Sequence, residues 1–376
     1  MANQQEFSVN MGDVMKKAYG EMKKDKNENL NVLILGKTGI GKTTLIRAIF
    51  GDNVPEGLVT GSGKPITQEI KSYKVSDDFT LYDSKGLEVK DYAAIKDDIE
   101  RFLQQKSRED VDKQIHIAWL CIAESGRRIE VADKEIWNLL QKYQIPSLVA
   151  ITKAERDKDE HGEKFSDIVK RTLQVNDDRM ERVRALSIED DDGERKPLMG
   201  INEIIQKSYK ILPEARKLAF ARKQTYDNAL RKEAAKKQAQ TIINRYSVAA
   251  GAVAATPIPF ADFAILLPTQ CAMIIHISNI YGLDISLESA KKVIPAFVAV
   301  AGVGFAAKVA VGSVLKFVPF IGTLTGGAIN ATVAGTTTKA MGELYIAYLD
   351  DNFDNLQEAF NNITAEALKS IQSRIG

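Results

Sequence analysis

The chain has 376 residues, enough for two domains, or three, with a sizeable core in each. Its 51 basic and 50 acidic side chains give a net charge of +1, so bulk charge offers no argument for nucleic-acid binding, and we expect no nucleic-acid partner. The two cysteines, Cys121 and Cys271, lie in separate apolar runs, and the first residues show no secretory signal, which together predict reduced, buried thiols in a cytoplasmic protein.

Residues 1–29 carry an apolar side chain at every third or fourth position from Phe7 to Met22, which is the spacing of a helix. A charged run rich in Lys, Asp, Glu and Asn then leads into the first apolar segment. We therefore expect a lead-in helix over residues 1–29 that packs on the body of the protein. The alternative is a membrane anchor.

An apolar run from Val32 to Leu35 is followed at once by the residues GKTGIGKT, which fit the pattern G-x-x-x-x-G-K-[ST]. Glycines at these positions allow the backbone to curl so that successive N–H groups point at phosphate oxygens, and the start of the next helix adds a positive dipole end. The lysine then reaches the β- and γ-phosphates, and the threonine hydroxyl can ligate Mg²⁺. The pattern predicts a nucleotide-phosphate site made of Gly36, Lys37, Thr38, Gly39, Ile40, Gly41, Lys42, Thr43 and Thr44.

From Leu30 to about Ile211, short apolar runs alternate with amphipathic segments, which is typical of an α/β domain with a mostly parallel sheet. The apolar runs predict strands near 31–35, 68–75, 79–83, 115–122, 146–152 and 182–188. The amphipathic segments predict helices near 42–50, 91–106, 130–143, 162–173 and 200–212.

Residues 83–86 read DSKG and end an apolar strand, so they fit D-x-x-G after the phosphate loop. Together the two motifs resemble the Ras-like superfamily of P-loop GTPases, with an Era-like G domain, over residues 30 to about 211. The resemblance implies that Asp83 holds Mg²⁺, usually through water, and that the Gly86 N–H meets the γ-phosphate. It also implies a switch threonine that caps Mg²⁺, for which we favour Thr67 over Thr60 because Thr67 lies just before a strand.

The base-reading element of that family, N-K-x-D after the fifth strand, corresponds here to Thr152-Lys153-Ala154-Glu155. A carboxylate accepts two hydrogen bonds, from guanine N1–H and N2–H₂, that adenine cannot offer. The resemblance therefore implies that Glu155 reads guanine with altered reach, that Lys153 lies against the base, and that Thr152 takes the asparagine position. Ser187 lies where the family has a short loop over the base edge.

The glutamine that Ras-type switches carry after D-x-x-G is replaced by Leu87, and Gly39 stands where potassium-stimulated members have an asparagine. We therefore expect slow GTP hydrolysis unless a partner supplies a group that positions water or stabilises charge. The two motifs are also similar to those of septin, dynamin and immunity-associated GTPases, several of which hydrolyse GTP when two G domains meet. This resemblance implies a homodimer through G domains, with Arg127 and Arg128 as candidate charges; the alternative is that both are exposed or form structural ion pairs.

The second half of the chain has a different composition. Residues 213–242 are rich in Ala, Lys and Arg and predict one long basic helix. Residues 246–283 and 293–338 then hold three formal charges, at Asp262, Lys308 and Lys316. Two interpretations remain open: hairpins inserted in a membrane behind a basic segment that attracts anionic lipid, or a bundle of buried helices. We favour membrane association by shallow hairpins.

The segments PIPFADFAILLPTQ and VPFIGTLTGGAINATVAGTTTKAMGELY resemble the hydrophobic helical domain of unknown function that follows the GTPase module in a group of mainly bacterial proteins. Residues 351–376 carry apolar side chains at helical spacing and predict a closing amphipathic helix. The expected domains are thus the lead-in helix, a GTPase domain at 30–211, a basic linker helix with the hydrophobic helical domain at 212–350, and the closing helix.

These resemblances imply a GTP-binding protein on the cytosolic face of a membrane, which hydrolyses GTP to GDP with Mg²⁺ and couples its nucleotide state to the helical domain. The expected metal ligands are Thr43, Thr67 and Asp83, and the expected catalytic groups are Lys42, Thr67 and Gly86. One alternative is a ribosome- or RNA-associated assembly GTPase, which the apolar rather than basic second half disfavours. Another is a nucleotide-binding scaffold with little turnover.

Overall fold

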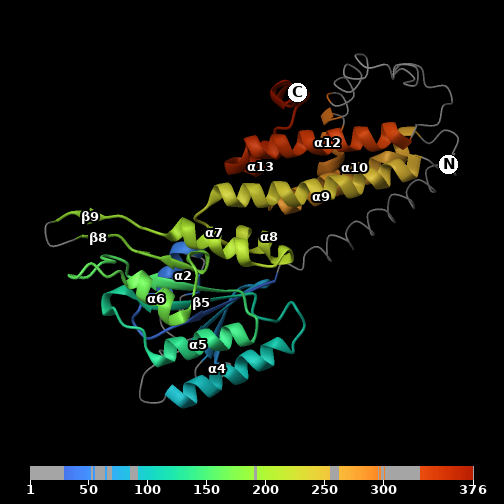
Figure 1. The fold of residues 1–376 in the computed structure, drawn as a ribbon. Coiled ribbons are helices and arrows are strands. Elements are labelled where there is room, and N and C mark those ends of the chain that lie inside the picture. Colours follow the sequence, from blue (N-terminus) through green and yellow to red (C-terminus); the bar gives the residue numbers. More distant parts are fainter. Residues whose placement is uncertain are drawn as a thin grey trace. The chain divides into compact units, whose positions relative to one another are not determined.

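The computed structural model describes residues 29–51, 54–55, 64–65, 70–84, 92–189, 193–254, 262–294, 296–297, 300 and 331–375. The chain divides into a first compact unit, Asn27–Arg231, and a second that contains Lys232–Gly376 (Figure 1). The lead-in helix expected at residues 1–29 lies outside the described residues, apart from Asn29. Each unit has a buried core of its own.

The first unit is built on a seven-stranded sheet in the order β2-β3-β4-β1-β5-β6-β7. The strands are β1 (Leu30–Leu35), β2 (Lys64–Pro65), β3 (Ile70–Ser76), β4 (Phe79–Ser84), β5 (Ile117–Ala123), β6 (Ser147–Thr152) and β7 (Met180–Arg182). Strands β4, β1, β5, β6 and β7 pair in parallel, whereas β2 and β3 form an antiparallel edge. The predicted α/β fold with a mostly parallel sheet is confirmed.

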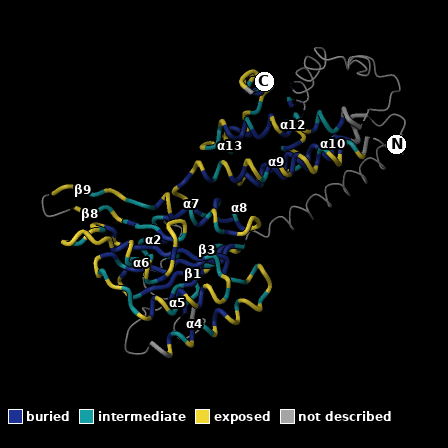
Figure 2. Tube along the Cα trace, viewed as in Figure 1, coloured by how far each residue is buried: buried dark blue, intermediate teal, exposed yellow. Residues whose placement is uncertain are grey.

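Helices cover both faces of this sheet. They are α2 (Lys42–Phe50), α4 (Tyr92–Ser107), α5 (Val131–Lys142), α6 (Phe165–Leu173), α7 (Ile201–Ile211) and α8 (Glu214–Lys223). One large apolar cluster joins the sheet to α4, α5 and α6. Elsewhere in this unit, Phe50 of α2 stacks on Trp119 of β5 and meets Phe220 of α8 edge to face. Strands β1 and β6 are therefore buried along their whole length, which explains their continuous apolar runs (Figure 2).

The last strand of the sheet differs from the prediction of a strand near 182–188, because β7 ends at Arg182. Val183 still donates its N–H to the Ile151 carbonyl at 2.7 Å, but Arg184 exchanges backbone hydrogen bonds with Met199 instead of with the sheet. The chain then forms a separate antiparallel ribbon of β8 (Ile188–Glu189) and β9 (Arg195–Lys196). Pairing with the returning chain, rather than the apolar pattern, therefore sets the end of this strand.

The single helix predicted at 213–242 is wrong, since the chain forms α8 and then α9 (Asn228–Ala254). The break is made by the fully buried side chain of Gln224, whose amide oxygen accepts the N–H groups of Tyr226 and Asp227 at 2.9 and 2.7 Å. Asp227 in turn accepts the Leu230 N–H at 2.9 Å and so caps the start of α9. Helix α8 belongs to the first unit, so part of the basic segment predicted at 213–242 lies in the first unit rather than in the second.

Three long helices, α9, α10 (Asp262–Ile280) and α12 (Ala331–Asp351), form most of the described part of the second unit. They lie side by side (Figures 1 and 2), and Gly342 of α12 permits a close approach. A Cβ at Gly342 would lie 2.6 Å from a side-chain carbon of Ile243 on α9 and 3.1 Å from the sulfur of Met273 on α10. Buried hydrogen bonds also join α10 to α12: the hydroxyls of Ser278 and Tyr345 lie 2.6 Å apart, and Tyr281, the residue after α10, donates its hydroxyl to Asp350 at 2.7 Å.

The predicted closing helix at 351–376 is also interrupted. Helix α12 ends at Asp351 and is followed by a 3₁₀ turn at Phe353–Asn355, α13 (Leu356–Asn361) and α14 (Ala365–Ile375). The hydroxyl of Thr364 accepts the Ala367 N–H at 3.2 Å, which starts a new helix after the break. The apolar stripe is nevertheless used, since Phe360, Leu368 and Ile371 are buried.

The two interpretations of the apolar second half are only partly tested. No helix within the described residues is both long and apolar enough to cross a membrane. Helix α10 is instead buried along most of its length against protein, as the bundle interpretation expects. Most of the stretch 293–338, with Lys308 and Lys316, lies outside the described residues, so its insertion in a membrane stays a prediction.

Candidate functional site

The loop between β1 and α2 has the backbone that the phosphate-site prediction requires. Gly36, Gly39 and Gly41 have φ values of 140°, 75° and 97°, which side chains other than glycine rarely adopt. Gly36 also has no room for a side chain, because a Cβ there would lie 2.4 Å from Ile40 Cδ1 and 2.6 Å from the Cys121 carbonyl oxygen. The loop can therefore present backbone N–H groups at the start of α2.

Lys42, the first residue of α2, is 8% exposed and points back over the loop. Its Nζ donates hydrogen bonds to the carbonyl oxygens of Gly36 at 2.9 Å and Lys37 at 3.1 Å. The ammonium group is thus held over the concave side of the loop, where a bound anion would meet it. Thr43 and Thr44 follow on the helix and are half-buried.

Asp83 lies at the end of β4, beside Ile34 of the neighbouring strand β1. Its carboxylate is 3.8 Å from Lys42 Nζ, so the structure brings these two predicted residues together. Burial raises the pKa of Asp83 to about 6, although Lys42 and Lys71 oppose the shift. Asp83 Oδ1 is buried and has no hydrogen-bond partner among the described residues. An orphaned carboxylate oxygen near Lys42, which Thr43 follows at the start of α2, fits a Mg²⁺ site for which Asp83 and Thr43 would be the ligands.

Other predicted residues of the phosphate side cannot be placed. Thr67 and Gly86 lie outside the described residues, as do the competing threonine Thr60 and the substituted position Leu87. Their roles stay predictions.

The residues predicted to read the base lie at the end of β6 and in the loop that follows, residues 153–164, here called the β6–α6 loop. Thr152 is buried and donates its hydroxyl to the Ile122 carbonyl at 3.3 Å, and a Cβ at Gly41 would lie 3.9 Å from Thr152 Cβ. Lys153 has a positive φ of 53°, and both Lys153 and Glu155 are exposed. These two side chains line one cavity of about 530 Å³, and Lys196 of β9 lies 3.5 Å from the Glu155 carboxylate.

Ser187, predicted to lie near the base edge, falls between β7 and β8 rather than at a strand end. Its hydroxyl accepts a hydrogen bond from Arg195 at 3.3 Å.

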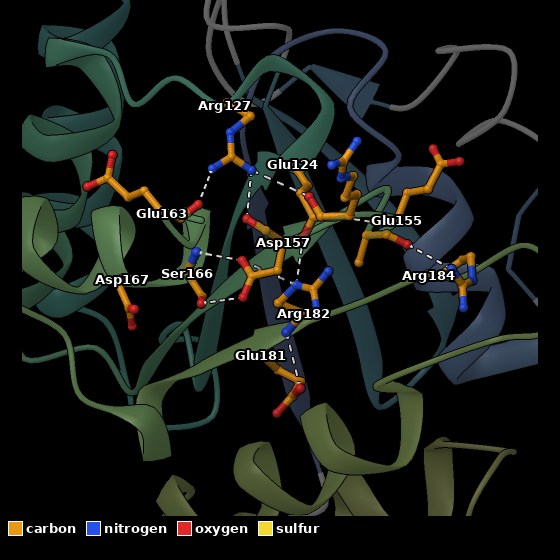
Figure 3. Close-up of polar contacts among 12 residues, drawn as sticks. Glu124, Arg127, Glu155, Asp157, Glu163, Ser166, Asp167, Glu181, Arg182 and Arg184 are labelled. Atoms are coloured by element: carbon orange, nitrogen blue, oxygen red, sulfur yellow. Dashed lines mark hydrogen bonds and ion pairs between the residues drawn. The ribbon is translucent and has the colours of Figure 1, made fainter. Parts of the chain in front are cut away.

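Sequence reasoning missed a partly buried ion-pair network beneath the β6–α6 loop, centred on the buried Glu124 (Figure 3). Glu124, directly after β5, accepts the Glu155 N–H at 2.5 Å through one carboxylate oxygen and Arg182 Nε at 2.6 Å through the other. Arg182 also lies 3.7 Å from Asp157, which accepts both the N–H and the hydroxyl of Ser166. The sequence shows only that an acidic residue, Glu124, follows an apolar strand. It does not indicate the partners of Glu124, which are distant along the chain.

The candidate trans-acting arginines differ in their surroundings. Arg127 donates to the carbonyl oxygens of Asp157 at 2.6 Å and Glu163 at 2.7 Å and pairs with Asp159 at 3.6 Å, which matches the structural alternative (Figure 3). Arg128 is exposed. Lys37 of the phosphate loop forms an ion pair with Glu130, the residue that caps α5.

Comparison with known proteins agrees with the division of the chain. Residues 31–153 match the model of a family described as 50S ribosome-binding GTPase. Residues 221–374 match a domain of unknown function, DUF697.

Three curated relatives match parts of the chain. Magnetosome membrane protein 22 of Magnetospirillum gryphiswaldense is 30% identical over 133 residues, which are 35% of this chain and 65% of that protein. The probable GTP-binding protein EngB of Methanococcus maripaludis is 27% identical over 44% of this chain and 75% of its own length. GTPase Der of Clostridium botulinum is 27% identical over 50% of this chain, which spans 43% of that protein.

Among solved structures, a probable GTP-binding protein EngB is 19% identical, with a TM-score of 0.34 over 48% of this chain and 97% of that one. The two family matches divide the chain into a domain of the family described as 50S ribosome-binding GTPase, over residues 31–153, and a C-terminal DUF697 domain, over residues 221–374.

Proposed function

We propose that the chain binds GTP with Mg²⁺ at the β1–α2 loop and hydrolyses it to GDP. The observation that carries the proposal is the approach of Lys42, at the start of α2, to Asp83, at the end of β4, with Nζ 3.8 Å from the carboxylate. Lys42 is buried and Asp83 is half-buried, and the buried Oδ1 of Asp83 has no hydrogen-bond partner among the described residues. A triphosphate with its cation would satisfy both groups at once.

The cationic residue would bind the phosphates, and the oxygen-bearing side chains would bind the metal ion. Lys42 would bind the β- and γ-phosphates in place of the backbone carbonyls that it contacts here. Thr43, Asp83 and the predicted switch residue Thr67 would hold Mg²⁺, which neutralises phosphate charge when it is bound. Gly86 would supply a backbone N–H to the γ-phosphate.

Guanine selectivity is proposed to come from Glu155. Its carboxylate is exposed beside a cavity that Lys153 also lines, so it is accessible to accept hydrogen bonds from N1–H and N2–H₂ of a base. The Thr152 hydroxyl donates to the Ile122 carbonyl, so a contact of Thr152 with the nucleotide would use its oxygen as an acceptor.

Hydrolysis is proposed to be slow in the isolated chain, since Leu87 replaces the water-positioning glutamine. A second G domain would then complete the site. Arg128 is the better candidate for a group supplied in trans, because Arg127 is already bound to the β6–α6 loop of its own chain.

The nucleotide state is proposed to control how the second unit engages an anionic membrane surface. Support comes from the low-charge stretch 293–338 and from the 30% identical relative whose name describes a membrane protein. The description of the matched GTPase family favours a ribosome as the second candidate. Cosedimentation with ribosomes that is lost on raising salt, together with indifference to vesicles, would favour that candidate.

The test of nucleotide binding is Lys42→Ala, measured with a fluorescent GDP analogue in the presence of Mg²⁺. We expect an affinity loss of about 100-fold or more, because the phosphates lose a buried charged donor. The matched control is Lys74→Ala, which removes an exposed lysine paired with Asp77 in the same unit and should leave affinity unchanged. Near-normal affinity in a folded Lys42→Ala protein would contradict the proposed site.

A further inference from the structure

The first part of the β6–α6 loop, residues 153–157, has no regular secondary structure, and side chains from other elements fix its course. Lys153 begins it with a positive φ, a conformation that is unfavourable for a lysine. Ala154 donates its N–H to Val183 at 3.1 Å, and Arg184 donates to the Ala154 carbonyl at 3.1 Å. Glu155, the proposed base-reading residue, is then held by its own backbone N–H.

That N–H is bound by Glu124, whose side chain is 2% exposed. At 2.5 Å the contact is a short, charge-assisted hydrogen bond between a buried carboxylate and the backbone of an exposed residue. The second oxygen of Glu124 accepts Arg182 Nε at 2.6 Å, so both oxygens have partners. Glu124 therefore joins the end of β5 to the backbone of the residue that would read the base.

Arg182 makes the burial of Glu124 tolerable by neutralising it, and it extends the network to Asp157 at 3.7 Å. Asp157 accepts the Ser166 N–H and hydroxyl at 2.9 and 2.7 Å, which anchors the far end of the loop at α6. Figure 3 shows Glu124, Asp157 and Arg182 pointing toward one another from the turn after β5, the β6–α6 loop and β7. The loop is thus held at both ends by one network.

The need for such a network follows from the length of Glu155. A glutamate has one more rotatable bond than the aspartate of the family pattern, so its carboxylate loses more freedom when it is fixed on a base. If the backbone were also free, bidentate recognition of guanine would be weak. Because the Glu155 N–H is already held at a fixed point, binding the base costs less backbone conformational entropy.

We propose that Glu124 is a positioning residue for base selectivity, acting through the Glu155 backbone and supported by Arg182. The inference rests on the proposed guanine-reading role of Glu155. It concerns discrimination between guanine and hypoxanthine nucleotides, because hypoxanthine lacks the N2 amino group and keeps N1–H. Loss of the Glu124 contact displaces the Glu155 carboxylate and so removes the advantage of the second hydrogen bond.

The experiment measures affinities for GDP and inosine diphosphate in the full chain with Mg²⁺. Glu124→Ala should lower the ratio of the two affinities by about tenfold, as Glu155→Ala should, since each change costs one hydrogen bond to a charged group. The double variant should show the Glu155→Ala ratio and no further loss, because Glu124 acts only through Glu155. Arg171→Ala, which breaks the exposed pair with Glu163 on the same loop, is the matched control and should leave the ratio unchanged.

The outcomes separate the inference from the proposed function. If Glu155→Ala leaves the ratio unchanged, the base-reading role of Glu155 is wrong. If Glu155→Ala lowers the ratio but Glu124→Ala does not, or if the two effects add, the positioning role of Glu124 is wrong. If Glu124 had a purely structural role, Glu124→Ala would lower the affinities for GDP and inosine diphosphate equally and leave their ratio unchanged. Should Glu124→Ala fail to fold, Arg182→Lys replaces it and should lower the ratio by severalfold, because lysine keeps the charge without the Nε–H geometry.

Discussion

His116 makes the stability of the first unit sensitive to mild acid. It precedes β5, is 5% exposed, and its Nδ1 accepts the Asn31 N–H at 3.0 Å while Nε2 contacts the Val111 carbonyl at 2.8 Å. Because Nδ1 is an acceptor, the proton is on Nε2 and the ring is neutral. Burial lowers the pKa of His116 from 6.5 to about 4, and the nearby Arg216 acts in the same direction.

The sign of the effect follows from which state binds the proton. Between pH 6.5 and about 4 the unfolded chain protonates His116 and the folded chain does not, so acid favours unfolding. The stabilisation is fully present above 6.5 and is lost as pH falls toward the folded pKa. Going from about pH 7.5 to about pH 5, linkage gives a loss of about 2 kcal/mol from this one group.

The assay is urea unfolding followed by tryptophan fluorescence, which reports the first unit because Trp119 and Trp137 are the only tryptophans. His116→Asn keeps an acceptor near Nδ1 but cannot titrate. We expect it to be less stable than the wild type at pH 7.5, with the difference shrinking by about 2 kcal/mol at pH 5. The matched control, His161→Asn, removes an exposed histidine and should follow the wild type at both pH values. A wild-type-minus-His116→Asn difference that stays constant across the window would refute the reasoning.

Three further outcomes are expected. Gly36→Ala should abolish nucleotide binding and destabilise the first unit by about 2 kcal/mol or more. Gly39→Ala, whose Cβ would have no atom of the described residues within 4 Å, should cost about 1 kcal/mol, and equal urea midpoints would contradict this. GTP turnover per molecule should rise with protein concentration, and a flat specific activity across any measured dimerisation constant would exclude a second G domain. The full chain should sediment with anionic but not neutral vesicles and partly resist a high-salt wash; indifference to lipid would support the buried-bundle interpretation.

The elements around the phosphate loop could be predicted because local signals agree there. An apolar strand, three glycines with positive φ and the helix that starts at Lys42 all follow from one short segment. Asp83 could be placed beside Lys42 because parallel neighbours end at the same edge of a sheet. For the base-reading loop, the sequence predicted the residues Thr152 to Glu155 but not the side chains that hold the loop in place.

What could not be predicted depends on contacts between distant residues. Arg182 is 58 positions from Glu124, and nothing in either segment indicates the pair. The break between α8 and α9 is similar, because Gln224 lies in a segment of strong helix formers and ends the helix only through its buried side-chain hydrogen bonds. Asp227, by contrast, is a capping residue that the sequence does show, three positions before Leu230.

The two cysteines give each unit an internal reporter. Cys121 lies in the first unit and Cys271 in the second, both buried, and burial raises the pKa of Cys121 to about 12 and that of Cys271 to about 11. An alkylating reagent can therefore react with either thiol only while its own unit is open, so labelling rates resolved by mass spectrometry yield two separate opening free energies from one sample. Nucleotide should slow the alkylation of Cys121, whose carbonyl lies against Gly36. The extent to which alkylation of Cys271 slows in the same sample would measure the coupling free energy between nucleotide binding and the opening of the second unit.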